Sequence, residues 1–430
     1  MASGVLTGSL TQQSAMNHLR LTFALVLAAS SVATAHGAPQ TWIAKQSVIK
    51  ANQKKRPGFN FDESKVPSYK LPDPLVSATG KAVTTVQDWK DSQRPAILKL
   101  FREHVYGVRP DAHYTVVHKE VGRRENAFGV GATARQIRTT VKSNDKSHSF
   151  DFVIVIPNSD APVPVIVHIN NRYLIPIDKT VDEFDPFWPV EKMVRRGYAT
   201  AAFHTSDVDP DEPGRYADGI RALLDDPGTD QGTRWRCLSS WAWAASRVLD
   251  FALEQPEIDS SRTAVAGNSR AGKTALWAGA EDERFALTYS NESGCGGASL
   301  SRRAYGENVA RITAVFPHWF CERFTSYSGR EEALPVDQHQ LISLLAPRAV
   351  YVGSADEDLW ADPKGEYTSL VKAGPVFDLF GLKRIKQPEM PPLNTPRQVG
   401  STGYHIRTGR HNLTEQDWGY FLDFADSIFK

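Results

Sequence analysis

The chain has 430 residues, of which 41% are hydrophobic, so it can bury the core of one large domain or of two ordinary ones. Fifty lysines and arginines balance 49 aspartates and glutamates, which argues against a nucleic-acid or membrane-surface binder, because such a protein usually carries a basic excess. Ten tryptophans and thirteen tyrosines can pack a core or stack on sugar rings, and composition alone leaves both uses open.

The N-terminal segment has the features of a secretory signal peptide. Arg20 precedes an apolar run over residues 21–29, and residues 33–35 read Ala-Thr-Ala, a cleavage-site pattern. The run is too short for a helix that spans a membrane. We therefore predict a signal peptide over residues 1–35 and an exported protein, with a buried N-terminal helix as the alternative. Residues 36–75 are polar with few apolar periods, which predicts an extended N-terminal arm.

The remaining residues, 76–430, alternate strand and helix patterns. The first helix is predicted over residues 86–106. Strands are predicted over residues 114–121, 129–141, 152–156, 163–169, 198–203, 263–266, 285–289 and 349–352. Further helices are predicted over residues 190–196, 238–252, 273–280 and 415–428, and a long surface loop over residues 205–235. Because apolar strands that alternate with helices form a parallel sheet covered on both faces, we predict a single α/β domain.

The stretch around Ser269 carries the most specific motif. A short strand meets a turn of small residues, Gly-Asn-Ser-Arg-Ala-Gly over residues 267–272, and a helix follows. This is the context in which an α/β-hydrolase exposes its nucleophilic serine, although Ala271 stands where the G-x-S-x-G motif has glycine. The same letters fit G-x-x-x-x-G-K-T, a phosphate-binding loop, and a turn that only caps a helix is the third possibility. We favour the serine, because the turn follows several strands and an exported protein meets little nucleotide.

A serine nucleophile needs a histidine base, which should follow it in the chain. The histidines after Ser269 are His318, His339, His405 and His411. We expect structural roles for His318 and His339. We place His405 and His411 in a loop between the last strand and the final helix, where a catalytic histidine should lie.

The base also needs a carboxylate to orient it. Glu292 and Asp358 each follow a predicted strand, at the carboxyl ends where open α/β sheets place their sites, so either can be the acid. The oxyanion needs amide donors, and Arg270 is expected to supply one, with the segment 170–172 as a further candidate.

The chain has three cysteines, which allow at most one disulfide among them: Cys237, Cys295 and Cys321. No C-x-x-C pair or histidine-rich metal spacing occurs in the sequence, so we predict no structural metal and no cofactor.

With these residues placed, the chain resembles the bacterial glucuronoyl esterases of carbohydrate esterase family 15. The family motif G-x-S-R-x-G-K is met by residues 267–273. The resemblance covers roughly residues 60–430 and continues through TALWAGAEDERFAL, SNESGCGGASLSRRAYGE, FPHWF, LPVDQHQLISLLAPR and DEDLWADP to the segment of His411. It implies an α/β-hydrolase with a mostly parallel central sheet and helices on both faces. It also implies a serine esterase that hydrolyses the ester between 4-O-methyl-glucuronic acid on xylan and lignin alcohols through a covalent acyl-enzyme.

The resemblance implies roles for eight residues. Those expected in the reaction are Ser269 as nucleophile, His411 as base, Arg270 at the oxyanion, and Glu292 and Asp358 as acids. Those expected to hold the glucuronate ring are Lys273, Glu307 and Trp360. Fungal members carry a cysteine where Asn268 stands here, so the disulfide that ties their nucleophile loop to their histidine loop is not expected.

Three other functions fit part of the pattern: a carbohydrate acetyl (acetylxylan) esterase, a P-loop nucleotide-binding protein and a non-catalytic sugar-binding protein. For the esterase we expect a glucuronoxylan or lignin–carbohydrate ester as substrate. We expect no nucleic-acid partner, no membrane association after signal cleavage, and a monomer.

Overall fold

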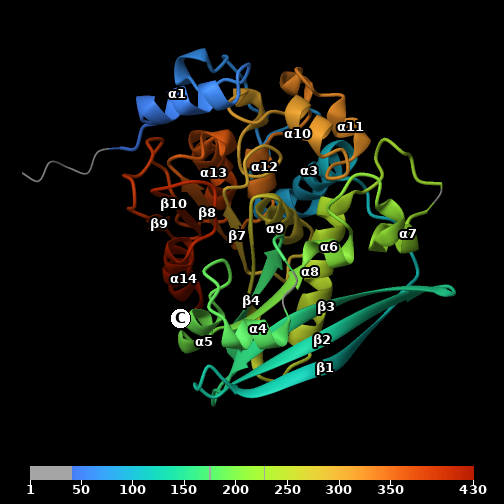
Figure 1. The fold of residues 1–430 in the computed structure, drawn as a ribbon. Helices are drawn as coiled ribbons and strands as arrows, with labels where there is room; N and C mark the ends of the chain where they lie inside the picture. Colours follow the sequence, from blue (N-terminus) through green and yellow to red (C-terminus); the bar gives the residue numbers. More distant parts are fainter. Residues whose placement is uncertain (1–40, 174–175, 227) are drawn as a thin grey trace, which may run out of the picture. The chain divides into compact units, whose positions relative to one another are not determined.

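The computed structural model describes residues 41–173, 176–226 and 228–430 (Figure 1). The predicted signal peptide, residues 1–35, lies outside the described residues. Contacts between residues join the described part of the chain into one compact unit. Within this part, no helix combines the length and apolarity needed to cross a bilayer.

The segment predicted as an extended arm contains a helix, α1 (Gln46–Lys55). Its glutamines, lysines and alanine are good helix formers. Val48 and Ile49 on this helix pack in a small apolar cluster with Phe61 and Trp360. The arm is therefore bound to the rest of the unit through side chains of α1 and of the segment that follows it.

A ten-stranded sheet runs through the unit in the order β1-β2-β3-β5-β4-β6-β7-β8-β10-β9. The strands are β1 (Thr115–Ala127), β2 (Ala132–Ser143), β3 (Lys146–Pro157), β4 (Val163–Asn170), β5 (Ala199–His204), β6 (Ile258–Asn268), β7 (Leu287–Asn291), β8 (Ala349–Ala355), β9 (Arg397–Val399) and β10 (Thr402–Arg407). The six strands from β5 to β10 in this order are parallel. The antiparallel strands β1–β3 extend the sheet at one side and β9 ends it at the other (Figure 1). The predicted mostly parallel sheet is confirmed.

Successive side chains of the central strands enter two separate apolar cores. On β4, Val165 and Val167 belong to one core and Ile166 belongs to the other. On β8, Val350 points into the first core and Tyr351 into the second. Because side chains alternate across a strand, a continuous apolar run requires cover on both faces. Helices α3, α8, α9, α12 and α13 cover the first face, and α5 and α14 cover the second.

The helices range from single turns to five turns. They are α2 (Val86–Asp88), α3 (Arg94–Phe101), α4 (Ile177–Asp182), α5 (Val190–Arg195), α6 (Thr205–Val208), α7 (Ile220–Leu224), α8 (Cys237–Leu253), α9 (Arg270–Glu281), α10 (Val309–Val315), α11 (Glu322–Thr325), α12 (Gln338–Ser343), α13 (Pro363–Leu379) and α14 (Glu415–Phe429). The π-helical turn Trp89–Gln93 joins α2 to α3, and a second one, Arg102–Tyr106, continues α3, which completes the single helical segment predicted over residues 86–106. Short 3-10 turns are η1 (Glu63–Lys65), η4 (Tyr216–Asp218), η5 (Ser301–Arg303), η6 (Glu331–Ala333) and η7 (Leu359–Ala361).

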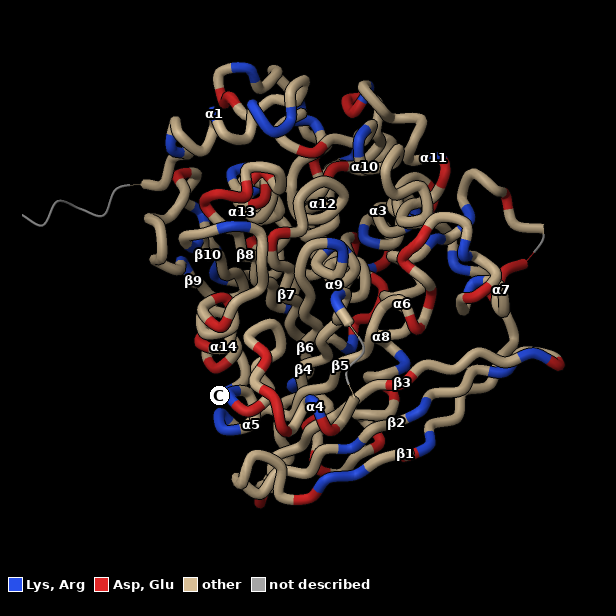
Figure 2. The backbone as a smooth tube through the Cα atoms, in the orientation of Figure 1, with Lys and Arg blue, Asp and Glu red and all other residues tan. Residues whose placement is uncertain are grey.

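Charged residues of both signs lie along the antiparallel extension β1–β3 (Figure 2). Arg135 on β2 pairs with Glu120 on β1 at 2.6 Å, and Arg138 on β2 pairs with Asp151 on β3 at 2.8 Å. Opposite charges on neighbouring strands stabilise such pairs modestly at the surface.

Two predictions about this fold are wrong. Residues 402–407, placed before the final helix as part of a loop, form β10, because their polar side chains find buried partners and need no apolar run. Residues 205–235 are not only a surface loop: they include α6 and α7, and the buried Arg221 pairs there with the buried Asp209.

Candidate active site

Ser269 stands between β6 and α9, at the centre of the sheet. Its backbone has φ 59° and ψ −123°, a left-handed conformation that a residue with a side chain rarely adopts. Its N–H donates to the carbonyl of Asn291 at 2.9 Å, and its carbonyl accepts from the N–H of Lys273 at 3.1 Å. The strained turn is thus held by β7 and by the first turn of α9, as the strand–turn–helix motif predicts.

The turn has room only for small residues. A Cβ on Gly267 would lie 2.2 Å from the carbonyl oxygen of Ala271, and a Cβ on Gly272 would lie 2.9 Å from that of Asn291. Ala271 itself is fully buried, so alanine fits where the usual motif has glycine. The second glycine of this motif is therefore needed one residue later, where α9 passes β7.

The register of the sheet gathers the ends of three strands at one edge. Asn268 of β6 pairs with Asn291 of β7, and Asn291 pairs with Gly353 of β8. The residues that follow these positions therefore leave the sheet side by side, as parallel strands require. Ser269 follows β6 and Glu292 follows β7, while Asp358 lies three residues beyond the end of β8.

His411 lies between β10 and α14, in residues 408–414, which we call the histidine loop. Its Nδ1 is 2.7 Å from Oδ2 of Asp358 and 3.0 Å from Oε2 of Glu292. Both carboxylates are buried, whereas the imidazole is 42% exposed. One ring nitrogen is thus fixed by two acids, and Nε2 is left for other partners. Among the described residues no hydrogen bond joins the Ser269 hydroxyl to this imidazole.

The two acids have different surroundings. Glu292 also receives a hydrogen bond from Arg407 at 2.6 Å on Oε1 and from the N–H of Asn412 at 2.8 Å on Oε2. Asp358 has His411 as its only side-chain partner among the described residues. The charge of Glu292 is therefore shared between two cations when His411 is protonated, and that of Asp358 is not.

The acids and the imidazole shift each other's titration. Burial lowers the pKa of His411, but Asp358 and then Glu292 raise it by more, to about 10. Burial raises the pKa of Glu292 to about 7, against the opposite effects of His411 and Arg407. The cluster therefore favours a protonated imidazole in the free protein.

These three groups could also be considered as metal ligands. One ligand atom from each of Glu292, Asp358 and His411 lies within 4.8 Å of the others. The atoms of these groups that face one another already form hydrogen bonds. The guanidinium of Arg407, 2.6 Å from Oε1 of Glu292, would also repel a cation. The geometry fits a charge-assisted hydrogen-bond cluster better than a metal site.

A chain of amides links the serine turn to the histidine loop. The side-chain N–H₂ of Asn291 donates to the side-chain oxygen of Asn268 at 2.9 Å and to the carbonyl of Asn412 at 3.0 Å. These hydrogen bonds connect the two loops at the place where the resemblance led us to expect no disulfide. The three cysteines of the chain are buried free thiols.

Arg270 follows the serine and begins α9. Its guanidinium pairs with Asp211 and lies 4.7 Å from the ring centroid of Trp319. Asp211 also accepts from Nε2 of His318 at 2.9 Å and from Nε1 of Trp319 at 2.6 Å. Burial raises the pKa of Asp211, but His318, Arg270 and Trp319 lower it by more, to below its usual value. The carboxylate therefore stays ionised beside Arg270. The arginine head is thereby fixed beside the turn.

Lys273 lies in the first turn of α9, four residues after Ser269, and Glu307 is one of its charged neighbours. Lys273 is 4% exposed and donates to the carbonyl of Ser293. Burial lowers the pKa of Lys273, and the charge of Glu307 offsets this only in part; burial raises the pKa of Glu307, and Lys273 offsets that only in part. Each charge thus stabilises the other in a poorly solvated place. The N–H of Glu307 donates to the carbonyl of Trp360 at 3.0 Å, which brings the third predicted ring-binding residue to this group.

The N-terminal arm supports Trp360. Phe59 meets its indole edge to face at 4.8 Å, and the Arg56 guanidinium lies 4.3 Å from the ring centroid. The carbonyl of Asn60 accepts from the N–H of Gly306 at 2.8 Å, one residue before Glu307. Residues 56–60 thus contact both segments that carry the predicted ring-binding side chains.

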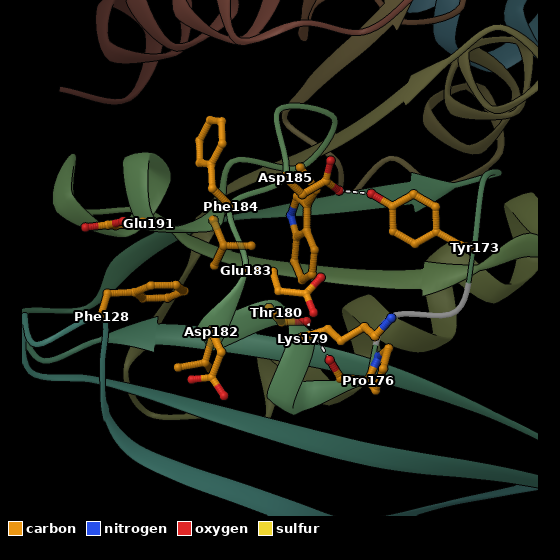
Figure 3. Close-up of a pocket in the computed structure, with 13 residues that line it drawn as sticks. Phe128, Tyr173, Pro176, Lys179, Thr180, Asp182, Glu183, Phe184, Asp185 and Glu191 are labelled. Carbon is orange, nitrogen blue, oxygen red and sulfur yellow. Dashed lines mark hydrogen bonds between the residues drawn. The ribbon is translucent and has the colours of Figure 1, made fainter.

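A cavity of about 550 Å³ opens beside the loop that follows β4 (Figure 3). Its wall includes Tyr173, Phe184 and Asp185, and the Tyr173 hydroxyl donates to the Asp185 carboxylate. The preceding Arg172 donates to the side-chain oxygen of Asn412 at 2.6 Å. The cavity therefore begins one residue from a side chain that contacts the histidine loop.

The other candidate histidines are hydrogen-bonded away from the two acids. Nε2 of His339 contacts the carbonyl of Pro72 at 2.8 Å, and His318 contacts Asp211 as described. His405 is not in a loop: it is buried within β10, where its Nε2 contacts Asp417 at 2.8 Å. Of the four histidines, only His411 faces the two acids.

Sequence reasoning missed two side chains. Arg407 and Asp211 hold Glu292 and Arg270, and neither stands in a motif. The only signal for Arg407 was an arginine four residues before the histidine. In the segment 170–172, expected as a further oxyanion donor, the N–H of Arg172 donates to the side-chain oxygen of Asn170 at 2.9 Å, whereas the side-chain nitrogen of Asn170 has no hydrogen-bond partner among the described residues.

The sheet, the central serine turn and the histidine–carboxylate cluster at its carboxyl edge define an α/β-hydrolase. A family model described as glucuronyl esterase, fungi, matches residues 139–381. The chain belongs to the glucuronoyl esterases of carbohydrate esterase family 15, which are carboxylic ester hydrolases.

Individual relatives match most of the chain. Carbohydrate esterase MZ0003, from an unknown prokaryotic organism, is 38% identical over 86% of this chain and 92% of the relative. The 4-O-methyl-glucuronoyl methylesterase of Neurospora crassa is 30% identical over 85% of this chain and 84% of that enzyme. A solved glucuronoyl esterase from Solibacter usitatus has a TM-score of 0.79 and 35% identity, over 85% of this chain and 100% of that one.

Proposed function

We propose that Ser269 is the nucleophile and His411 the base of a two-step acyl transfer. His411 takes the serine proton on Nε2 while the serine oxygen attacks the ester carbonyl, and it returns the proton to the leaving alcohol. Water then hydrolyses the acyl-enzyme by the same route. The observation that carries this proposal is the binding of Nδ1 by two buried carboxylates, Asp358 at 2.7 Å and Glu292 at 3.0 Å. The hydrogen bond between Ser269 and His411 would form when substrate fills the site, as is common for catalytic pairs.

Asp358 is the principal acid in this proposal. Its carboxylate is the nearer of the two to Nδ1, and it has no competing cation among the described residues. Glu292 supports it, but shares its charge with Arg407.

The oxyanion is stabilised at the start of α9. The N–H of Arg270 is the first of the helix, where backbone N–H groups and the helix dipole favour negative charge. The guanidinium of the same residue, fixed by Asp211 and Trp319, adds a positive charge nearby.

The substrate is an ester of 4-O-methyl-glucuronate, with xylan on the sugar side and a lignin alcohol as leaving group. The relatives' names, glucuronoyl esterase and 4-O-methyl-glucuronoyl methylesterase, support the uronate acyl group. Lys273 and Glu307 offer a donor and an acceptor for sugar hydroxyls, and Trp360 offers an aromatic face. Residues 41–75 support Trp360 and the segment that carries Glu307.

Hydrolysis of benzyl glucuronate tests the proposal, with acetylated xylan as the competing substrate. We expect rapid release of benzyl alcohol, little deacetylation, and loss of both activities in Ser269→Ala. Ser261→Ala, on the exposed part of the same strand β6, serves as the matched control and should behave as wild type. Deacetylation without uronate-ester cleavage would replace the substrate with an acetyl ester. An active Ser269→Ala variant would refute the mechanism.

We also propose that the protein is exported and acts as a monomer. The apolar run and Ala-Thr-Ala pattern before residue 36 support export. N-terminal sequencing of secreted protein and sedimentation analysis test the two statements; a retained N-terminus or a dimer would contradict them.

A further inference from the structure

Arg407, the last residue of β10, is buried and occupies the centre of a polar network. Its side chain is 3% exposed. Nε contacts both carboxylate oxygens of Asp417, at 2.8 and 2.7 Å. Nη2 donates to Oε1 of Glu292 at 2.6 Å. The guanidinium therefore bridges a carboxylate of α14 and the acid that follows β7.

The same Nη2 also holds the backbone of the histidine loop. It donates to the carbonyl of Arg410 at 3.1 Å and to the carbonyl of Asn412 at 2.7 Å. These carbonyls belong to the residues immediately before and after His411. One guanidinium thus fixes the loop on both sides of the imidazole and, through Glu292, one of the acids that face Nδ1.

The remaining contacts of this network bind it to the fold. Asp417 accepts from the N–H of Thr414 at 2.7 Å and from its hydroxyl at 2.6 Å, at the start of α14. His405 contacts Asp417 at 2.8 Å from within β10. Arg407 is therefore anchored on its far side by rigid elements, as a group that positions another must be.

We propose that Arg407 is a positioning residue for the reaction, which holds the histidine loop and Glu292 in the one arrangement that presents the imidazole to Ser269. The inference rests on the proposed roles of Ser269 and His411. Arg407 itself touches no reacting atom. Its two separate donor nitrogens suit the task, because Nε holds Asp417 while Nη2 holds Glu292 and the loop carbonyls, whereas a lysine has only one nitrogen for both sides.

The alternative is that Arg407 only stabilises the fold, as buried arginines often do. Arg302 provides the matched control for this alternative. It is similarly buried, with a 6% exposed side chain, and donates to the carbonyl of Val336 at 2.8 Å and to Asp337 at 3.2 Å. It resembles Arg407 in burial, charge and type of partner, but its partners do not belong to the proposed site.

The test compares Arg407→Lys and Arg407→Met with Arg302→Lys and Arg302→Met in the full chain. All variants are assayed well below their melting temperatures, for benzyl glucuronate hydrolysis and for the rate at which a fluorophosphonate labels Ser269. Labelling needs the oriented imidazole but no sugar, so it reports on Arg407 even if the substrate proposed above is wrong.

We expect Arg407→Met to lower kcat and the labelling rate about 10²-fold with KM unchanged, since a small misplacement of a catalytic group has costs of that order. Arg407→Lys should recover part of the loss. The Arg302 variants should have lower melting temperatures but keep the wild-type kcat and labelling rate. If Arg407→Met does not fold, Arg407→Lys and Asp417→Asn, which loosens the far anchor, carry the same test with smaller losses. Unchanged labelling in the Arg407 variants, or equal losses in the Arg302 variants, would overturn the inference.

Discussion

Replacing Asp358 with asparagine should lower the activity more than replacing Glu292 with glutamine. The two carboxylates lie 2.7 and 3.0 Å from Nδ1 of His411. At an effective dielectric constant of about 20, this difference in distance alone corresponds to about 0.6 kcal/mol in favour of Asp358, or roughly threefold. Solvent at the exposed imidazole reduces this energy difference, while the pairing of Glu292 with Arg407 at 2.6 Å increases it.

The double variant should lose far more than either single one. Removing the only acid of a serine triad costs about 10⁴-fold in kcat. Here each acid can hold Nδ1 when the other is neutralised, so we expect about 10- to 10²-fold for Asp358→Asn, less for Glu292→Gln, and about 10⁴-fold for both together.

The pH dependence gives a second measure of the same geometry. His411 acts as a base only when neutral, and its raised pKa, about 10, places the acid limb of kcat/KM above the ordinary histidine range near 6.5. Removing either Asp358 or Glu292 removes a charge that favours the imidazolium. The limb should therefore move to lower pH in both variants, and the loss of activity should be smaller at acid than at alkaline pH.

Steady-state hydrolysis of benzyl glucuronate across the pH range measures all three effects. Melting temperatures of the variants serve as the control for folding. The reasoning would be refuted by an acid limb that stays in place in both single variants, or by a Glu292→Gln variant as inactive as the double one.

Three further predictions concern the serine turn. Ser269→Ala should lower kcat by about 10⁵- to 10⁶-fold while leaving the melting temperature unchanged, which a sensitive ester assay and calorimetry can check. Gly267→Ala should destabilise the fold by about 1–3 kcal/mol, because its Cβ would lie 2.2 Å from a backbone oxygen; Gly419→Ala in α14, where the nearest atom is 3.8 Å away, should not, and equal unfolding curves would contradict this. Arg270→Ala should lower kcat about 10²-fold and Asp211→Asn should lower it less, because Trp319 still packs on the guanidinium; a larger loss in Asp211→Asn would count against the proposed role of Arg270.

Much of the fold, and the groups that the fold gathers in the candidate site, could be predicted because their signals are local. The apolar runs of β4 and β8 identify strands buried on both faces, and Gly267 to Gly272 identify the turn around Ser269. Strand β10 was missed because its sequence, Thr-Gly-Tyr-His-Ile-Arg, has no apolar run: its histidine and arginine are satisfied by Asp417 on α14.

The side chains that hold the reacting groups could not be predicted for a related reason. Arg407 contacts Glu292, which is 115 positions away in the chain, and Asp211 contacts Arg270, 59 positions away. Neither contact leaves a pattern of spacing in the sequence. Both contacts can be recognised only in the folded structure.

The presence of two acids on one imidazole has a consequence for how this enzyme can change by mutation. In the proposed mechanism, a substitution at Glu292 or at Asp358 should leave a weakened catalyst rather than an inactive one, so selection would have an active intermediate. The position of the acid can then move between the ends of β7 and β8 over evolutionary time, by gradual steps. Ser269 and His411 have no such duplicate. Libraries that randomise residues 292 and 358 should therefore yield active clones far more often than libraries that randomise 269 and 411.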